Sequence, residues 1–562
     1  MPMFLNRLLS REKGIFLLLF ALAVLVASVV IMSMVPPVSK DALVHHLAVP
    51  KLYLNHGGIY EIPFMDFSYY PMNLDLLYMI PLYFGNDIIP KLIHFAFALS
   101  TAWIIFIYLK KRAGILYGLS GAVFFLSTPV IVKLSINVYV DLGIIFFSFA
   151  ALLLILKWLN TDFKTRYLIY SGIMCGLALG TKYNGLITFV ILALFIPYLY
   201  SRSSRDKIHL YRRSLFHFLT FVLTALVIFS PWMIRNYYWK GNPIYPLYNS
   251  IFKPSVKTAQ ENANRAGEET VSQNRGFFTF RGYIYGESAL EIAALPLRIF
   301  FEGRDGDPRY FDGKLNPFLL IFTILAFLPL KNIPAFLRRE KMIFLIFSIL
   351  FFSMAFFTAV LRIRYISPII PPLTVLSMLG IKNLLDLFYR KSSWYFRTGG
   401  SLLVVVFFTF SLTLNMNYII KLYKEVDPLP YIMGEINRDD YISKFIPEYP
   451  ALKFINTKTD KDSRIFFIYM GKRGYYCDRE YEFNPGFLHN LILKARTPYD
   501  IFSGFRKKRI THLLIFQPLF QKWVRDNCSV ERQQLLRNFF LKYSASVFYR
   551  NGFELMVLKS NG

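Results

Sequence analysis

The chain has 562 residues, of which 55% are hydrophobic, 18% aromatic and 18% charged. Soluble domains carry roughly 25% charged residues, and a soluble chain of this length would divide into several domains of about 100–200 residues. Here the apolar residues form repeated runs of about 18–25, the length that crosses a bilayer. The composition therefore predicts a polytopic α-helical membrane protein and excludes a disordered, a collagenous and a disulfide-rich chain.

The formal net charge of +29 does not indicate a nucleic-acid-binding protein, because the basic residues gather in no single patch. They form short clusters between apolar runs, where Lys and Arg set the membrane topology and contact anionic lipid headgroups. Of the three cysteines, Cys175 lies inside an apolar run and is predicted to be a small core residue. The spacing does not decide whether Cys477 and Cys528 pair.

About eleven apolar runs are expected to cross the membrane. They cover about residues 14–35, 87–109, 113–132, 138–158, 167–181, 184–200, 214–233, 316–330, 342–361, 365–381 and 399–420. The first run is too long for a signal-peptide core, and no small-residue cleavage site follows it, so we predict an uncleaved helix. The tenth contains Pro368, Pro371 and Pro372, breaks that membrane helices tolerate where neighbouring groups satisfy the backbone.

Six basic clusters predict the orientation. They are Arg7, Arg11 and Lys13; Lys110, Lys111 and Arg112; Lys157, Lys164 and Arg166; Arg202, Arg205, Lys207, Arg212 and Arg213; Lys331, Arg338, Arg339 and Lys341; and Lys382, Arg390, Lys391 and Arg397. All fall on the side of the N-terminus, which the positive-inside rule places in the cytoplasm. We therefore expect a multi-pass protein of the plasma (inner) membrane with its C-terminal region outside.

Three long segments then face outside: about residues 36–86, about 234–315 and the tail that begins near Asn415. Long loops on one face indicate that function lies there. We expect residues 1–424 to form the membrane domain and residues 425–562 a small extracytoplasmic α/β domain. Its predicted elements are strands at 463–471 and 511–516, helices at 435–456 and 519–543, and a hairpin at 546–559 around Asn551-Gly552.

The first external loop carries the leading catalytic candidate, Asp41. Residues 41–55 are predicted to form an interfacial helix on which Asp41 and His45 share a face. Its apolar residues are expected to face lipid: Leu43, Leu47 and Leu54. Asp41 is either a base that accepts the proton of an acceptor hydroxyl or the N-cap of the helix. The local pattern favours the cap, and the two roles are compatible.

Other polar residues of this loop have weaker patterns. Glu61 and Asp75 are expected to be solvated, whereas Asp66 is a candidate contact for an acceptor or a sugar, together with His45 and Tyr69. In so aromatic a chain Tyr69 is alternatively a core residue or an interface anchor. The histidines of the loop lack the tight spacing of metal ligands, so no metal site is expected.

Asp141 stands at the external start of the fourth span. An ionisable residue at membrane depth is costly and is by default a functional candidate. The alternative is a helix end in contact with water.

Cations at other external helix ends oppose the positive-inside bias: Lys182, Arg235 and Arg364, the last followed by Tyr365. A phosphate at the outer interface would explain them, since Arg binds phosphate with a bidentate fork and Lys with a point charge. The alternative is snorkelling to outer headgroups. For Lys182 and Arg364 we favour phosphate.

At these residues the chain resembles the GT-C glycosyltransferases, membrane enzymes that use polyprenyl-phosphate sugars. It is most similar to the bacterial branch related to protein O-mannosyltransferases and lipid A aminoarabinose transferases. The resemblance covers about residues 14–420. It depends on 41–47 (DALVHHL) with 51–57 (KLYLNHG), 180–185 (GTKYNG), 231–236 (PWMIRN) with 241–246 (GNPIYP), and Arg364-Tyr365 before Pro368.

The resemblance implies a transferase that moves a sugar from a polyprenyl-phosphate donor to a hydroxyl of a lipid, glycan or protein on the outer face. Asp41 maps to the base of the family, although this chain has Ala42 where many members carry a second acid. Asp141 is expected to share the catalytic work. Lys182 and Arg364, with Tyr365 and Arg235, are expected near the donor phosphate. Most relatives of this branch need no metal, so no cofactor is expected.

Two other functions compete with this hypothesis. A transporter or flippase of a lipid-linked or polymeric glycan would also need many helices and phosphate-binding cations, but it predicts inverted repeats and charges near the membrane midplane. No repeat is evident in the sequence. The sequence does not distinguish well between the leading hypothesis and an O-antigen-type ligase or polymerase, which joins whole chains and not single sugars. Motifs of ATP-driven transport and of soluble hydrolases are absent from the sequence.

Overall fold

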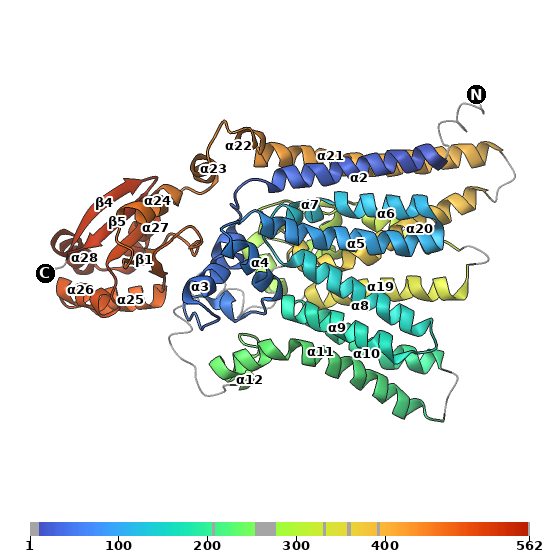
Figure 1. The fold of residues 1–562 in the computed structure, drawn as a ribbon, viewed down its shortest axis with the longest axis horizontal. Helices are drawn as coiled ribbons and strands as arrows, with labels where there is room; N and C mark the ends of the chain where they lie inside the picture. Colours follow the sequence, from blue (N-terminus) through green and yellow to red (C-terminus); the bar gives the residue numbers. More distant parts are fainter. Residues whose placement is uncertain are drawn as a thin grey trace.

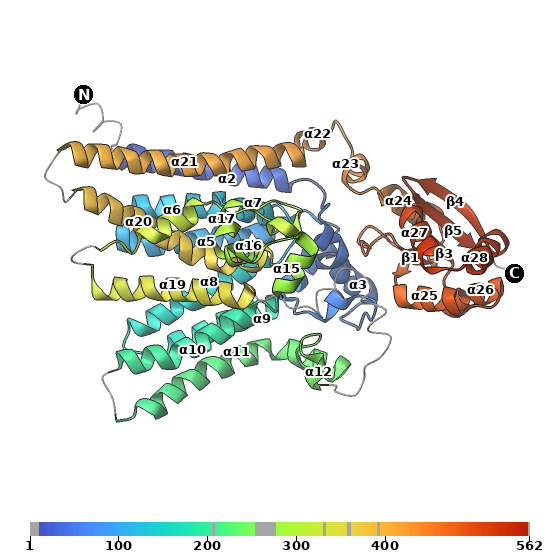
Figure 2. The same ribbon diagram turned by 180° about the vertical axis from the view of Figure 1, so that it is seen from behind.

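The computed structural model describes residues 11–204, 208–252, 277–329, 333–356, 361–389 and 394–559. Long helices run side by side in a bundle, and a small sheet domain lies at one end of it (Figure 1). The start of α2 (Arg11–Ser33) lies at the opposite end of the bundle (Figure 1). Figure 2 shows the same arrangement from behind, with α2 and α21 (Trp394–Val426) together along one edge.

The other long elements follow the predicted apolar runs. They are α5 (Ile89–Ala113), α6 (Ile115–Ser127), α7 (Pro129–Ser135), α8 (Asp141–Leu159), α9 (Thr165–Thr181), α10 (Gly185–Ser203), α11 (Leu210–Lys240), α18 (Phe318–Leu325), α19 (Ala335–Phe356) and α20 (Ile370–Tyr389). The segments predicted to be external hold shorter helices: η1 (Ala42–His46), α3 (Ala48–His56), η2 (Asp66–Tyr69), α4 (Asn73–Tyr83), α12 (Asn249–Phe252), α15 (Phe277–Tyr285), α16 (Ala289–Ala293), α17 (Leu295–Phe301), η3 (Pro308–Tyr310), η4 (Ile363–Tyr365) and η5 (Ser367–Ile369).

Within the described residues, seven helices are long and apolar enough to cross a membrane, and the pair α6 and α7, bent by 66°, makes an eighth candidate. The protein is therefore a multi-span membrane protein. Each of the eleven predicted runs contains a helix, but α9 has 17 residues and α18 only 8, so the number eleven stays a prediction. The orientation also stays a prediction. Six of the basic residues that support it lie outside the described residues: Arg7, Arg205, Lys207, Lys331, Arg390 and Lys391.

Burial separates central from peripheral helices. The segment Ser367–Tyr389 is 83% buried across its apolar window, whereas α2 and α21 are only 17% and 22% buried. A helix that is apolar on all sides but is not covered by the rest of the protein contacts lipid in a membrane. The bundle thus has α20 at its centre and α2 with α21 at its lipid-facing edge.

The C-terminal domain has a five-stranded sheet of order β2-β1-β3-β5-β4. The strands are β1 (Arg464–Ile468), β2 (Glu480–Glu482), β3 (His512–Phe516), β4 (Ser544–Arg550) and β5 (Phe553–Leu558). Strand β1 is parallel to β2 and β3, and β5 is antiparallel to β3 and β4. The helices are α22 (Leu429–Ile432), α23 (Arg438–Phe445), α24 (Tyr449–Lys458), α25 (Pro485–Lys494), α26 (Pro498–Lys507), α27 (Gln517–Asn527) and α28 (Val530–Tyr543).

This domain confirms the predicted strands and the hairpin. Asn551 and Gly552 both have positive φ, 54° and 81°, as a two-residue hairpin turn of the twisted type requires. Sequence patterns did not predict β2, α25 and α26. Cys175, Cys477 and Cys528 are all free and buried. The boundary between residues 424 and 425 stays a prediction; α21 ends at Val426.

Candidate active site

Four segments far apart in the chain bring two carboxylates and two cations together. Arg364 of η4 donates from Nη1 to Asp41 Oδ2 at 2.5 Å, and Lys182 Nζ donates to Asp141 Oδ1 at 2.7 Å. The side chain of Asp141 is 1% exposed, and the other three are 12–24% exposed. Asp141 is the first residue of α8, and Lys182 follows the last residue of α9. Ion pairs this buried need good geometry to offset their desolvation.

The backbone around Asp41 differs from the predicted interfacial helix. Residues Ala42–His46 form a single π-helical turn, a feature found frequently at functional sites, and the regular helix α3 begins only at Ala48. Asp41 itself has right-handed helical backbone angles and makes no side-chain capping bond. The prediction that Asp41 is a helix cap is therefore wrong, and its carboxylate binds Arg364 instead.

Two further expectations for this loop are corrected. Leu43 and Leu47 are 1% and 0% exposed, packed inside protein and not against lipid, because the C-terminal domain and the membrane helices cover the loop. Asp75, expected to be solvated, is 2% exposed at the start of α4. Its Oδ1 lies 2.6 Å from His46 Nδ1. Glu61 remains partly exposed and pairs with Lys240 at 2.7 Å.

Aromatic rings line the two cations. Lys182 Nζ lies 5.1 Å from the centre of the Tyr365 ring, and the Arg364 guanidinium lies 5.3 Å from Tyr365 and 5.4 Å from Tyr139. Such contacts hold a cation more firmly once it is desolvated. Asn184 donates to the Tyr365 carbonyl at 3.2 Å, so the link after α9 is tied directly to η4.

Packing against Asn73 explains the glycine at position 180. A Cβ on Gly180 would lie 2.2 Å from Nδ2 of Asn73, so a larger residue there would displace the Asn73 side chain. Asn73 Oδ1 in turn accepts a bond from Trp232 Nε1 at 2.8 Å. The motif thus joins Lys182 to the first external loop.

The environment sets the charge states of Asp41 and Arg364. Burial alone would raise the pKa of Asp41, but the Arg364 guanidinium, with its charge and its hydrogen bond, holds that pKa well below its ordinary value. Burial alone would lower the pKa of Arg364, and the Asp41 charge raises it well above the usual range. The pair is therefore ionised at neutral pH.

His46 and Asp75 form a different kind of pair. Burial lowers the pKa of His46 to about 3 and raises that of Asp75 to about 7, because both charged forms are disfavoured away from water. Burial thus opposes a charged pair here, and the 2.6 Å contact is a hydrogen bond between His46 and Asp75. His45 stacks on Phe67, with ring centres 4.5 Å apart, and burial also lowers the pKa of His45 well below its ordinary value.

Three buried polar atoms at this site have no hydrogen-bond partner within the described residues: Asp141 Oδ2, Arg364 Nε and His45 Nδ1. Buried polar atoms in native proteins are almost always paired, with protein, water or ligand. Water or a bound polar group can pair these three atoms, which lie on side chains from three of the segments that meet at the site.

The remaining predicted residues surround this centre and do not touch it. Arg235 stacks between Trp232 and Trp239, at 4.5 Å and 4.9 Å from their rings, and donates to the Tyr70 carbonyl at 3.0 Å. Tyr69 is 2% exposed and donates to Glu61 at 2.6 Å, so the core alternative describes this ring.

Asp66 is exposed on the other side of the same loop. It pairs with Lys472 of the C-terminal domain at 3.2 Å. Sequence patterns also missed Tyr139, His46 and Asp75 as members of the site. Only the position of Tyr139 beside Asp141 pointed toward it.

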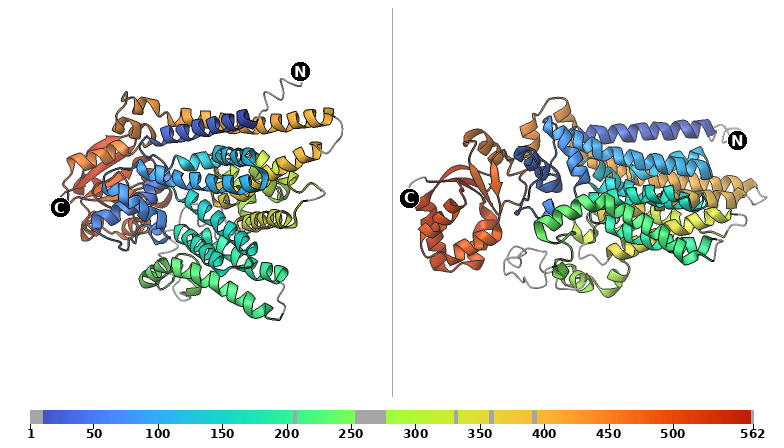
Figure 3. Two further views of the ribbon diagram at one scale, coloured as in Figure 1. Left: turned by 45° about the vertical axis from the view of Figure 1, so that its right-hand side comes forward. Right: turned by 60° about the horizontal axis from the view of Figure 1, so that its bottom comes forward.

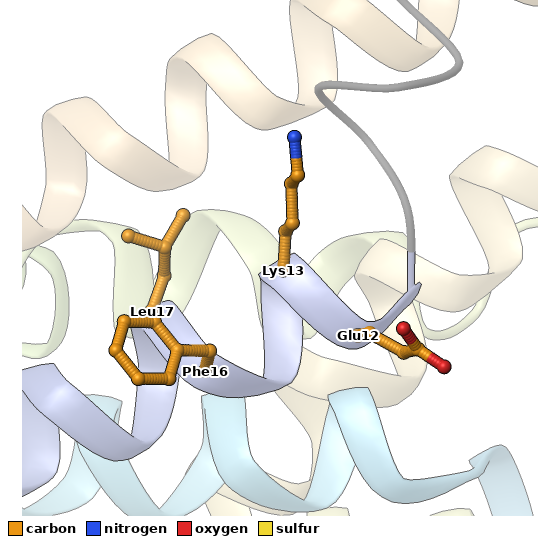
Figure 4. A pocket seen from close by; sticks show the side chains of 4 residues that line it. All are labelled: Glu12, Lys13, Phe16 and Leu17. Atoms are coloured by element: carbon orange, nitrogen blue, oxygen red, sulfur yellow. The ribbon is translucent and has the colours of Figure 1, made fainter.

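Two hollows lie away from these residues. One, of about 430 Å³, is lined by Glu12, Lys13, Phe16 and Leu17 at the start of α2 (Figure 4). Phe16 and Leu17 are 69% and 62% exposed, as expected for a surface that faces lipid. The other, of about 450 Å³, lies between the ends of α8 and α10 and the starts of α11 and α19. Within the described residues no group of three or more His, Cys, Asp or Glu is placed to hold a metal.

Comparisons with known proteins relate this arrangement to a fold. The family model described as dolichyl-phosphate-mannose-protein mannosyltransferase matches residues 84–235, which include Asp141 and Lys182. No curated protein matches the chain.

Three solved structures are similar to the chain. ArnT from Cupriavidus metallidurans in the apo state is 14% identical, with 97% of this chain and 98% of that chain covered and a TM-score of 0.55. The same protein bound to undecaprenyl phosphate gives a TM-score of 0.53 at the same identity and coverage. The apo oligosaccharyltransferase of Archaeoglobus fulgidus is 14% identical, with 88% and 69% covered and a TM-score of 0.48. The match to ArnT shows that the chain has the GT-C fold along nearly its whole length.

Proposed function

We propose that the protein is a glycosyltransferase that moves a sugar from a polyprenyl-phosphate donor to a hydroxyl of a lipid, glycan or protein acceptor at the outer face of the membrane. The observation that carries the proposal is the convergence of Asp41 and Asp141 with Lys182 and Arg364 at one end of the bundle. The family-model match supports the reaction class. The undecaprenyl phosphate bound by a protein of the same fold supports the donor class.

Lys182 and Arg364 are proposed to stabilise the polyprenyl phosphate as it leaves the sugar. When the bond between the anomeric carbon and the phosphate oxygen breaks, the polyprenyl phosphate takes both electrons and gains negative charge. Lys182 and Arg364 are largely buried, and once the phosphate takes the place of Asp41 on Arg364 their charges stabilise the developing negative charge. Tyr365 lies against both cations and keeps their side chains on the phosphate. Arg235, beside Trp232 and the Tyr70 carbonyl, adds a positive charge near these two cations.

Asp41 suits the acceptor. Its carboxylate accepts the proton of the acceptor hydroxyl as that oxygen attacks the anomeric carbon, a contribution of about 10²–10⁴-fold. Attack opposite the phosphate inverts the anomeric centre. Asp141 keeps Lys182 in place through one oxygen and leaves the other for the sugar or the acceptor. His45, with its unpartnered Nδ1, is a second contact for a hydroxyl.

Three strains with matched expression test the proposal, carrying the wild-type protein, no protein, or Asp41→Asn. Mass spectrometry of the envelope lipids, glycans and proteins compares them. We expect one sugar mass to disappear in both altered strains. If the strain without the protein loses no sugar, the enzyme proposal fails. If Asp41→Asn restores the sugar, Asp41 is not the base. Purified protein then releases undecaprenyl phosphate from an undecaprenyl-phosphate-linked monosaccharide only when extracted envelope acceptor is present.

A further inference from the structure

The C-terminal domain contacts the segment that carries Asp41. The link between β1 and β2 includes a strap, Tyr475–Asp478, that reaches the first external loop. The Tyr475 amide donates to the Leu43 carbonyl at 3.2 Å, and the Tyr476 hydroxyl donates to the Pro37 carbonyl at 2.7 Å. Pro37 precedes Asp41 and Leu43 follows it, so the two bonds hold the backbone on either side of that residue. Figure 3 shows the domain over this end of the bundle.

Lys51 of α3 fastens the strap from the membrane-domain side. Its ammonium donates to the carbonyls of Tyr475 and Cys477 at 2.8 Å and 3.2 Å, and to Asp478 Oδ1 at 2.6 Å. An ammonium has three donors, and here all three are used on the strap.

A second anchor fixes the far side of the strap. Asp87, which precedes α5, accepts a bond from the Tyr475 hydroxyl at 3.2 Å and pairs with Arg438 of α23. Tyr475, Cys477 and Asp87 are 8%, 3% and 5% exposed. Leu43 and Tyr475 belong to one apolar core that also contains Ile442 and Leu555 of the C-terminal domain. The contact is therefore a packed interface with charged anchors.

We infer that the strap Tyr475–Asp478 is a positioning element, which holds the Asp41 carboxylate at its distance from Arg364 and so makes the C-terminal domain a working part of sugar transfer. The inference rests on the proposed function. Asp41 immediately precedes the π-helical turn Ala42–His46, and its side chain makes no capping bond to that turn. A displacement of about 1 Å at a reacting group costs on the order of 10²-fold in rate. The hydrogen bonds to Pro37 and Leu43 prevent such a displacement.

The test compares Lys51→Met with Lys51→Arg and with Lys444→Met as the matched control. Lys444 also pairs with a carboxylate, that of Asp427 at 2.7 Å, but both side chains are largely exposed in the C-terminal domain. Tyr476→Phe removes one hydroxyl and keeps the ring, so it serves if Lys51→Met does not fold. Release of undecaprenyl phosphate from an undecaprenyl-phosphate-linked monosaccharide gives kcat and KM, and amide hydrogen exchange reports on residues 41–47.

We expect kcat to fall about 10- to 100-fold in Lys51→Met, with KM for the donor changed less than about threefold and faster exchange confined to residues 41–47. The acidic limb of the kcat/KM profile should move to higher pH, because Asp41 loses the close charge of Arg364. Lys51→Arg should recover most of kcat, and Lys444→Met should match wild type. Unchanged kcat and exchange in Lys51→Met and Tyr476→Phe would overturn the inference. An inactive wild-type protein would instead overturn the proposed function.

Discussion

The ion pair between Asp41 and Arg364 sets two proposed roles in competition. Arg364 is proposed to bind the donor phosphate, yet in this structure its Nη1 is 2.5 Å from the carboxylate of the proposed base. A phosphate must therefore displace Asp41 from the guanidinium before it binds. Removing the charge of Asp41 should have two opposite effects: transfer is lost, while binding of the lipid phosphate becomes tighter.

The size of the second effect follows from the geometry. A hydrogen bond to a charged group is worth about 1.5–3 kcal/mol. We take the lower end, because the Asp41 side chain is 24% exposed and an Asn in its place still accepts a weaker bond from Arg364. Asp41→Asn should therefore tighten the Kd for undecaprenyl phosphate about tenfold, since each 1.4 kcal/mol is a factor of ten. Arg364→Gln should weaken it by about 10- to 100-fold.

Equilibrium binding of radiolabelled undecaprenyl phosphate to the protein in nanodiscs measures both changes. Asp386→Asn is the matched control, because that carboxylate also pairs with a cation, Lys382 at 2.5 Å, but on α20 away from the site. We expect the control to bind like wild type. The reasoning is refuted if Asp41→Asn binds the lipid more weakly than wild type, since the carboxylate would then assist phosphate binding.

Other substitutions test single elements of the site. Lys182→Met removes the ion-pair partner of Asp141, whose side chain is 1% exposed. The substitution should lower the free energy of unfolding by about 3–5 kcal/mol, measured as a lower Tm in detergent. The double variant with Asp141→Asn should recover most of that loss. Arg364→Gln should move the acidic limb of the pH profile of kcat/KM to higher pH, because Arg364 holds the pKa of Asp41 low. An unchanged limb would show that the titration of Asp41 does not determine it. Burial raises the pKa of Asp75 to about 7, so the folded state holds this proton more tightly than the unfolded state does. The Tm should therefore fall as pH rises from about 4 to 7, and Asp75→Asn should make the Tm less dependent on pH in that range.

Much of the fold and part of the site follow from local patterns. Apolar runs predict helices because each span buries its own backbone bonds, and all eleven runs contain a helix. Asp41, Asp141, Lys182 and Arg364 all sit near helix ends that alternation of spans places on one face. That reasoning predicts that these four residues lie close together, but it does not predict which residue pairs with which. An ion pair depends on how far the side chains reach between segments, here up to 323 residues apart.

The missed features depend on long-range packing. Nothing near Asp75 in sequence predicts its burial, since the covering groups come from the π-helical turn and from the membrane helices. The cap at Asp41 was favoured by local pattern, and a contact with Arg364 overrides that pattern. The strap Tyr475–Asp478 lies more than 420 residues from Lys51, and its sequence resembles an ordinary exposed loop.

The distribution of charge along α8 favours the proposed transferase over a transporter. Asp141 begins this helix at the site, and Asn160, just beyond its last residue, donates at 2.8 Å to Glu340, which also binds Arg112. From Leu142 to Leu156 the sequence holds no charged residue. The hydrogen bonds to this stretch include those of Thr188 to Ser148 and of Ser171 to the Ala151 carbonyl, both at 2.9 Å. A lipid phosphate carried across the membrane would need cations along such a helix. The charges of α8 stand at its two ends, which suits a phosphate that reacts at one face and does not cross.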